Sequence, residues 1–236
     1  MCSFNVKFFD VVIQIDANFI ESRTFFEKFL TEETCEVMIQ VDFSEIQAVH
    51  EKIKSFDLRM CERAILKYKI DKIAVDYNAF PIHASALMYK NNAYIFTALS
   101  GVGKSTHAKL WREAFGKDVI MINDDRPYLK VTDKGVFAYS HPQAGKHNIY
   151  TNTMCKVLMI GKIVRDNSNF VKEMSKPEFF PFFVQQTFTM DDYKTTKKII
   201  GLIKKALTYV QVCEVHCNMD PDAAYNIYKQ VNKIQM

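Results

Sequence analysis

The sequence has no uninterrupted apolar run close to the roughly 18 to 20 residues that a membrane-spanning helix requires. Its N-terminus also lacks a basic end followed by an apolar middle, because Lys7, Asp10 and Asp16 interrupt the first apolar stretch. We therefore expect a cytoplasmic protein with no membrane partner.

Cysteine is scattered, with six residues in a chain of 236. A chain of this length can bury a sizeable core and needs no disulfide framework, so reduced and mostly buried thiols are expected. Only Cys213, His216 and Cys217 suggest a metal. A strand over residues 210–217 would put the two cysteines on one face and the histidine on the other, so zinc is the weaker interpretation.

The sequence also lacks a basic excess large enough to indicate a nucleic-acid partner, since its net charge is only +4. Basic and aromatic residues are not interleaved as they are in RNA-binding proteins. The charge is unevenly distributed, however: positions 1–80 hold 10 Lys and Arg against 14 Asp and Glu, whereas positions 81–236 hold 21 against 13. The second part is therefore suited to bind anions such as phosphate groups.

No repeat or low-complexity tract is present, so periodicity and turn residues predict the organisation. The first part, residues 1–80, is predicted to be a small α+β domain for a substrate or partner, without a catalytic signature. Its expected elements are a strand over 5–15, a helix over 20–30, a strand over 35–41 and a helical stretch over 44–69 with a break near 55–57.

The second part, residues 81–236, shows strands joined in hairpins with helices between them. This pattern predicts an α/β fold, or an α+β fold, with a mixed sheet. The expected elements are a hairpin of 84–89 and 93–99, a helix over 104–115, a strand over 119–122, a hairpin of 127–131 and 136–139, a strand over 157–164, helices over 177–188 and 191–207, a strand over 210–217, and a last helix with Asp220 as N-cap and Pro221 at its first position.

The strongest chemical signal is a segment between an apolar strand and an amphipathic helix, Ser100-Gly101-Val102-Gly103-Lys104-Ser105-Thr106, which we call the glycine loop. The two glycines let backbone N–H groups turn toward phosphate oxygens, and the helix N-terminus adds its positive end. Lys104 can reach the β- and γ-phosphates, and the Ser105 hydroxyl can ligate Mg²⁺. Ala98 replaces the first glycine of the strict pattern, but a turn that binds nothing would not need Lys and Ser at the helix start.

The predicted strand over 119–122 leads directly into Asn123, Asp124 and Asp125. Adjacent carboxylates are costly at a strand end unless water or a cation shares them. In phosphoryl transfer, one can ligate the metal while the other accepts the proton of the attacking hydroxyl. The alternative is a polar turn whose side chains cap the backbone, and the glycine loop upstream favours the functional interpretation.

Two further segments are candidates with open alternatives. His83 precedes a strand and is either a hydrogen-bonded structural residue or a member of the site. The segment Gly145-Lys146-His147 is either a clamp for a γ-phosphate or an acidic substrate, or a solvated basic loop. Arg126, directly after the two acids, competes with Lys146 as the additional cation.

Together, in this order, His83-Ala84-Ser85, the glycine loop, Asn123-Asp124-Asp125 and Gly145-Lys146-His147 resemble the HPr kinase-like family. Its nucleotide-binding core is similar to that of ATP-dependent phosphoenolpyruvate carboxykinase. The resemblance covers nearly the whole chain, and its specific motifs lie between about Ile82 and His147. The true HPr kinases have a larger N-terminal domain and a second signature for the protein substrate, and neither is matched here, so the resemblance does not extend to HPr as the substrate.

The resemblance implies a carboxykinase-type P-loop core with a mixed sheet, with Lys104 and Ser105 as phosphate and metal contacts. It implies that Asp124 and Asp125 divide the base and metal roles, here assigned in that order although the reverse is open. His83 would lie beside the metal or the transferred phosphoryl group. Relatives of this kind are often oligomeric, so a homo-oligomer is among the partners considered.

The predicted function is a Mg²⁺-dependent transfer of the γ-phosphoryl group of ATP, with ADP as product, to a hydroxyl. The acceptor expected first is a serine of a peptide or protein. A kinase for a small metabolite and a catalytically silent nucleotide sensor are the alternatives. Retention of Lys104, Ser105, Asp124 and Asp125 argues against the silent sensor, which has no need of a proton acceptor.

Overall fold

The structure is a computed structural model that describes residues 2–145, 148–187 and 192–233. The chain divides into two compact units, Met1–Tyr77 and Asn78–Met236, a division slightly earlier than the one placed after residue 80 by the sequence. Within the described ranges, no helix combines the length and the apolar character needed to traverse a bilayer.

The first unit begins with a hairpin, where the sequence predicts one strand over 5–15. Strands β1 (Cys2–Phe8) and β2 (Val11–Ala17) pair antiparallel. Phe9 and Asp10 connect them with φ angles of 39° and 65°, as the two central residues of a tight hairpin turn require. The single-strand prediction is therefore wrong. The sequence does contain a sign of the turn. The buried apolar residues Val6 and Phe8 occupy even positions, whereas Val11 and Ile13 occupy odd ones, so one continuous strand could not place all four on the same face.

Helices cover this hairpin and are defined by their caps. The strand β3 (Val37–Gln40) extends the sheet parallel to β2, and α1 (Ile20–Phe25) precedes it. Helix α2 (Phe43–Lys52) starts with a capping box of Asp42 and Glu45. Helix α3 (Leu58–Asp76) starts where the Asp57 carboxylate accepts the N–H of Met60 at 2.8 Å, so the predicted break near 55–57 is confirmed.

The second unit is built on a curled mixed sheet of nine strands among the described residues, ordered β4-β8-β9-β10-β6-β5-β7, with β12 beside β10 and β11 beside β12. The predicted mixed α/β class is confirmed. The strands are β4 (Ala79–Pro81), β5 (Ala84–Tyr89), β6 (Asn92–Thr97), β7 (Ile120–Asn123), β8 (Tyr128–Thr132), β9 (Gly135–Tyr139), β10 (Met154–Arg165), β11 (Phe170–Glu173) and β12 (Gln211–Cys217).

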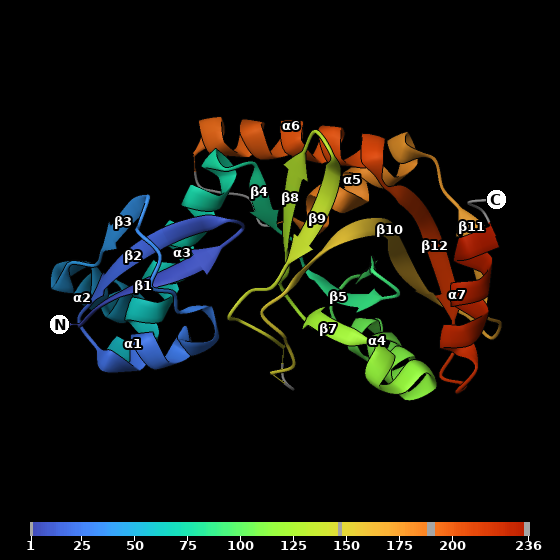
Figure 1. The fold of residues 1–236 in the computed structure, drawn as a ribbon, viewed down its shortest axis with the longest axis horizontal. Helices are drawn as coiled ribbons and strands as arrows, with labels where there is room; N and C mark the ends of the chain where they lie inside the picture. Colours follow the sequence, from blue (N-terminus) through green and yellow to red (C-terminus); the bar gives the residue numbers. More distant parts are fainter. Residues whose placement is uncertain (1, 146–147, 188–191, 234–236) are drawn as a thin grey trace. The chain divides into compact units, whose positions relative to one another are not determined.

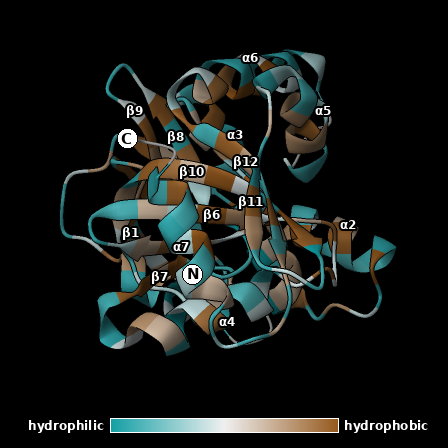
Figure 2. Ribbon diagram, turned by 90° about the vertical axis from the view of Figure 1, so that its right-hand side faces the viewer, coloured by the Kyte–Doolittle hydropathy of each residue, from teal (hydrophilic) through white to brown (hydrophobic). Residues whose placement is uncertain are grey.

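Helices α5 (Lys176–Gln186) and α6 (Tyr193–Tyr209) lie along one side of this sheet, and α4 (Lys104–Phe115) lies along the other (Figures 1 and 2). Helix α7 (Ala223–Lys233) shares the core of α4, in which Trp111 is fully buried. The apolar colouring of β6 and β10 in Figure 2 shows why helices must cover both faces. This core fixes the position of the loop that precedes α4.

The element predictions in this unit agree closely with the structure. Helix α4 has the predicted bounds, and both predicted hairpins form. The short strands β4 and β11 were missed. The last helix begins at Ala223 and not at Pro221. The residues before it form a turn, which is closed by a hydrogen bond of 3.0 Å from the Ala223 N–H to the Asp220 carbonyl.

Candidate functional site

One edge of the large sheet brings together the three segments that carry the sequence motifs. Strand β6 ends at Thr97, which pairs with Ala84 at the start of β5. Strand β7 ends at Asn123, which pairs with Ala86 of β5. Because β5 is antiparallel to both neighbours, its first residues lie at the same edge as the last residues of β6 and β7. His83, the glycine loop and the two acids therefore meet at this edge.

Two further strands end at this edge on the other side of β6. Strand β10 is parallel to β6 and to β12, and Arg165 at its end pairs with Cys217 at the end of β12. The order along the edge is β7, β5, β6, β10 and β12. Since neighbouring strands are about 4.8 Å apart, the acids after β7 lie about two strand spacings, roughly 10 Å, from the loop after β6.

The conformation of the glycine loop depends on its two glycines. Gly101 and Gly103 have φ angles of 78° and 134°, a region that other residues rarely adopt. A Cβ atom at either position would meet nothing within 4 Å, so the backbone itself forms the open surface. In the described part of the chain, the N–H groups of Gly101, Gly103 and Lys104 donate to no protein acceptor. They remain available to an anion at the N-terminus of α4.

Lys104 is buried, with 7% of its surface exposed, and its ammonium group donates to the carbonyl of Ala98 at 3.0 Å. Burial lowers the pKa of Lys104, and the nearby charge of Asp125 opposes this effect. A buried cation that has only a neutral acceptor as hydrogen-bond partner is poorly compensated. An anionic ligand at the loop would supply the missing negative charge. Ser105 and Thr106 follow at exposed positions of the first turn of α4.

Asn123 shapes the turn that presents the acids. Its carboxamide is fully buried, and its oxygen accepts the N–H groups of Asp125 at 2.9 Å and Arg126 at 2.6 Å. Its NH₂ group donates to the carbonyls of His141 and Gln143 at 2.8 and 3.0 Å. All of these bonds end on backbone atoms, so the side chain has a structural role. Asn123 therefore caps the backbone of this turn, as the alternative interpretation expected.

Asp125 and His83 form a half-exposed pair beside the lysine. Nε2 of His83 lies 3.7 Å from Oδ1 of Asp125, and the backbone N–H of His83 donates to the carbonyl of Gln186 at 2.8 Å. Burial and the charge of Lys104 lower the pKa of His83, while Asp125 raises it. Asp125, His83 and Lys104 are thus electrostatically coupled, although they come from three separate segments of the sequence.

Asp124 is more enclosed than Asp125. It is 5% exposed, and its Oδ1 accepts the N–H of Gly145 at 2.7 Å. A Cβ atom on Gly145 would lie 3.3 Å from Oδ2 of Asp124, which explains why glycine fits there. The loop with Gly145 therefore reaches the acids, while Lys146 and His147 lie outside the described residues.

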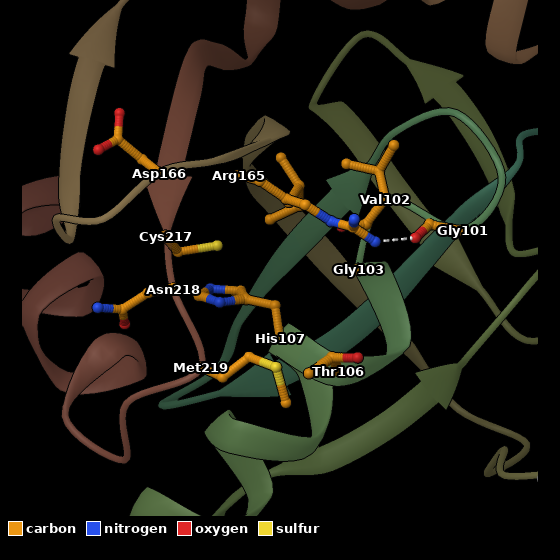
Figure 3. Close-up of a pocket in the computed structure, with 11 residues that line it drawn as sticks. Gly101, Val102, Gly103, Thr106, His107, Arg165, Asp166, Cys217, Asn218 and Met219 are labelled. Atoms are coloured by element: carbon orange, nitrogen blue, oxygen red, sulfur yellow. Dashed lines mark hydrogen bonds between the residues drawn. The ribbon is translucent and has the colours of Figure 1, made fainter.

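Arg165 is a site residue that the sequence analysis did not identify. Its guanidinium donates to the carbonyls of Val102, at 2.9 Å, and Gly101 (Figure 3). These bonds connect the end of β10 to two carbonyls of the loop and use no N–H group of the loop. The available signal was its position at the end of a long apolar strand, but the pairing of β10 with β6 could not be deduced from the sequence.

A cleft of about 420 Å³ opens beside the loop. Gly101, Gly103 and His107 line it from the loop and α4, while Asn218 and Met219 line it from the segment after β12 (Figure 3). A second cavity of about 700 Å³ lies on the side of β10 and Phe182. The glycine loop thus separates two spaces of ligand size, and the acids lie on neither lining.

Cys213 and Cys217 lie on one face of β12 in the apolar core, as predicted, with His216 outside that core. Burial raises the pKa of Cys213 to about 12 and that of Cys217 to about 11, so both stay protonated thiols. His216 stacks on Phe170 and contacts Asp166 at 2.9 Å. Among the described residues, no group of three or more His, Cys, Asp or Glu is arranged to hold a metal ion by itself.

No protein-family model matches the chain, and no curated protein matches it. Among the solved structures that match is the Hpr(Ser) kinase/phosphatase from Coxiella burnetii, with 11% sequence identity and a TM-score of 0.29. The match covers 54% of this chain and 96% of that one. This similarity is too low to indicate an activity.

Proposed function

We propose that the protein is an ATP-dependent, Mg²⁺-dependent phosphotransferase that moves the γ-phosphoryl group to a hydroxyl. The observation that carries the proposal is the glycine loop, whose N–H groups of Gly101, Gly103 and Lys104 have no protein acceptor and surround the start of α4. The loop adjoins a buried lysine and a coupled carboxylate, the set of groups that phosphoryl transfer uses.

The order of strand ends supports an orientation for the nucleotide. With the phosphates on the loop after β6, the acids after β7 lie on one side and the cleft beside Asn218 lies on the other. The γ-phosphate would then point toward Asp124 and Asp125, and the nucleoside toward the cleft. The acceptor hydroxyl would approach from the side of the acids.

Magnesium fits the residues at this edge. Mg²⁺ prefers oxygen ligands and is commonly held by one or two carboxylates together with substrate phosphates, keeping several waters. The Asp125 side chain is 32% exposed, and the Ser105 hydroxyl is exposed at the start of α4. These two oxygens would hold the ion beside the phosphates. When bound, the ion would neutralise charge on the transferred group.

The remaining groups have proposed roles in proton transfer and in charge stabilisation. Asp124, enclosed and oriented by Gly145, is proposed as the base for the acceptor hydroxyl. Lys104 is proposed to contact the β- and γ-phosphates, and His83 to lie beside the metal or the transferred group. Lys146 is proposed as the additional cation at the γ-phosphate, with Arg126 as its competitor. The acceptor suggested by the family resemblance is a serine of a peptide or protein.

Lys104→Ala should remove most of the thermal stabilisation that ADP and Mg²⁺ give the wild type. At a ligand concentration of about 100 times Kd, binding stabilises the native state by about 2.7 kcal/mol, a rise of roughly 5 to 10 °C in Tm for a protein of this size. The variant lacks the ammonium group that balances the phosphates, so its Tm should shift by a small fraction of this amount.

Lys109→Ala is the matched control, because Lys109 lies on the same helix with 65% of its side chain exposed and forms an ion pair with Glu113 at the surface. Its ADP-induced shift should equal that of the wild type. Equal shifts in the Lys104 and Lys109 variants, checked by calorimetric titration with ADP, would show that the loop is not a phosphate site.

Asp125→Asn should raise the Mg²⁺ concentration required for tight ADP binding. Removal of a residue that only supports a metal ligand typically lowers metal affinity by roughly 10- to 100-fold. Loss of a charged ligand itself should lower the Mg²⁺ affinity by at least this factor. Calorimetric titration of ADP at a series of Mg²⁺ concentrations measures this change. Asp118→Asn, at an exposed position just before β7, is the control and should behave as wild type. Identical Mg²⁺ curves for the two variants would remove Asp125 from the metal site.

A further inference from the structure

His107 is a buried polar residue on α4 that the proposed reaction does not use. It is 1% exposed, and it lines the cleft beside the glycine loop. In Figure 3 its ring extends from α4 into the space bounded by Cys217, Asn218 and Met219. A polar ring at this position has to satisfy both of its nitrogens or leave one for a ligand.

The neighbouring tryptophan fixes the protonation of this ring. Nε1 of Trp111 lies 3.0 Å from Nε2 of His107. An indole N–H can only donate a hydrogen bond, so Nε2 must accept, and the neutral ring carries its hydrogen on Nδ1. Burial lowers the pKa of His107 to about 3, which keeps the ring neutral near pH 7. His107 is therefore a fixed donor at Nδ1.

This donor has no acceptor in the protein. Nδ1 of His107 is buried and makes no hydrogen bond within the described part of the chain. A buried donor without a partner is costly, and native structures contain few of them. The cleft of about 420 Å³ that the ring borders has the size of a small-molecule site and is continuous with the glycine loop.

We propose that this cleft holds the adenine base of the nucleotide and that His107 donates its Nδ1 hydrogen to a ring nitrogen of the base. The inference rests on the proposed function, which brings the phosphates to the adjoining loop. Apolar groups of Val102, Ile163 and Met219 line the same cleft and can cover a flat ring. A base that presents an unprotonated ring nitrogen satisfies the donor, whereas a C–H group in its place leaves it unpaired.

Three analogues of ADP identify the contact, each with one ring nitrogen replaced by C–H: 1-deaza-, 3-deaza- and 7-deaza-ADP. One of them should bind the wild type about ten-fold more weakly than ADP, the size of effect expected when a buried donor loses its acceptor. The other two should bind within about two-fold of ADP, since they keep the contacted nitrogen. Calorimetric titration in the presence of Mg²⁺ measures all four affinities on the intact protein.

A matched pair of variants separates the two nitrogens of the ring. The amide of asparagine can place its NH₂ near the position of Nδ1, and the amide of glutamine can place its oxygen near the position of Nε2. His107→Gln should keep an acceptor for Trp111 but lose the discrimination among the analogues. His107→Asn should lose the Trp111 bond but keep the discrimination. If His107 only supports Trp111, ADP binding should instead be weakened more by His107→Asn than by His107→Gln.

The outcomes are distinguishable from failure of the proposed function. If wild type binds no adenine nucleotide, both proposals are wrong. If it binds ADP and all three analogues equally, the phosphotransferase proposal stands and the base contact is overturned. If the analogues bind equally but His107→Gln weakens ADP, the donor serves the sugar or a phosphate, and the assignment to the base is wrong. The analogue series needs no variant, so a variant that fails to fold does not prevent the test.

Discussion

Asp124→Asn is expected to lower the rate of phosphoryl transfer by about two to four orders of magnitude, the range typical of losing a general base. The change removes the proton acceptor but keeps the shape of the side chain. An asparagine oxygen can still accept the Gly145 N–H that lies 2.7 Å from Oδ1 in the wild type. The loop, the fold and ADP binding should therefore survive the substitution.

The measurement is the formation of ADP from ATP, with water and with a set of serine-containing peptides as acceptors. The pH profile provides a readout that a structural role would not change. A general base produces an acidic limb in the rate, because protonation removes its function, and Asp124→Asn should lack that limb. Unchanged turnover in a folded variant would reduce Asp124 to a support for Gly145. A loss of ADP binding would mean that it holds the nucleotide.

Asp124 and Asp125 differ in ways that the sequence could not show. Adjacent acids after an apolar strand predict a shared chemical role, and the sequence pattern makes both of them candidates. Their environments follow from tertiary structure: Asp124 is 5% exposed and bonded to Gly145, whereas Asp125 is partly exposed and near His83. The division of base and metal roles therefore stays a prediction, which the two asparagine variants test.

Local signals predicted the loop and its helix because they do not depend on distant residues. Glycine at positive φ, a lysine at the helix start and Gly116 at its end define α4 within a short stretch. The prediction at 5–15 failed for a local reason as well. Phe9 adopts a positive φ that bulky residues rarely take, so the turn lacks the usual Asn or Gly signal.

Arg165 and the segment with Asn218 could not be predicted because long-range strand pairing brings them to the site. Asn218 is more than a hundred residues from the glycine loop, and only the parallel pairing of β12 with β10 and of β10 with β6 places it there. The unpaired nitrogen of His107 depends in addition on burial and on the Trp111 bond. The sequence contains these residues, but their roles depend on the sheet order.

Below its ordinary pKa of 6.5, His107 should make the fold strongly sensitive to acid. Burial lowers its pKa in the folded state to about 3, so the unfolded chain binds the proton first as the pH falls. The stability that depends on the neutral ring is therefore fully present above about pH 6.5 and is lost progressively below it. Each pKa unit corresponds to about 1.4 kcal/mol.

The free energy of unfolding should accordingly fall by about 2 kcal/mol between roughly pH 6.5 and pH 4.5 through this residue alone. Carried to about pH 3, the loss reaches about 4 kcal/mol, a large part of the stability of an ordinary domain. The pKa of His107 is lowered by burial, so added salt should leave this component nearly unchanged.

His107→Gln isolates the effect, because glutamine does not titrate and can still accept the Trp111 N–H. Urea unfolding followed by the fluorescence of Trp111, the single tryptophan of the chain, reports on the unit that contains the site. The wild type should lose stability faster than the variant as the pH falls below 6.5, with a difference in slope that approaches about 1.4 kcal/mol per pH unit. Parallel curves for the two proteins would mean that His107 is not held neutral by burial. The hydrogen on Nδ1 follows from the Trp111 bond to Nε2, so the proposed base contact is tested separately by the analogue series.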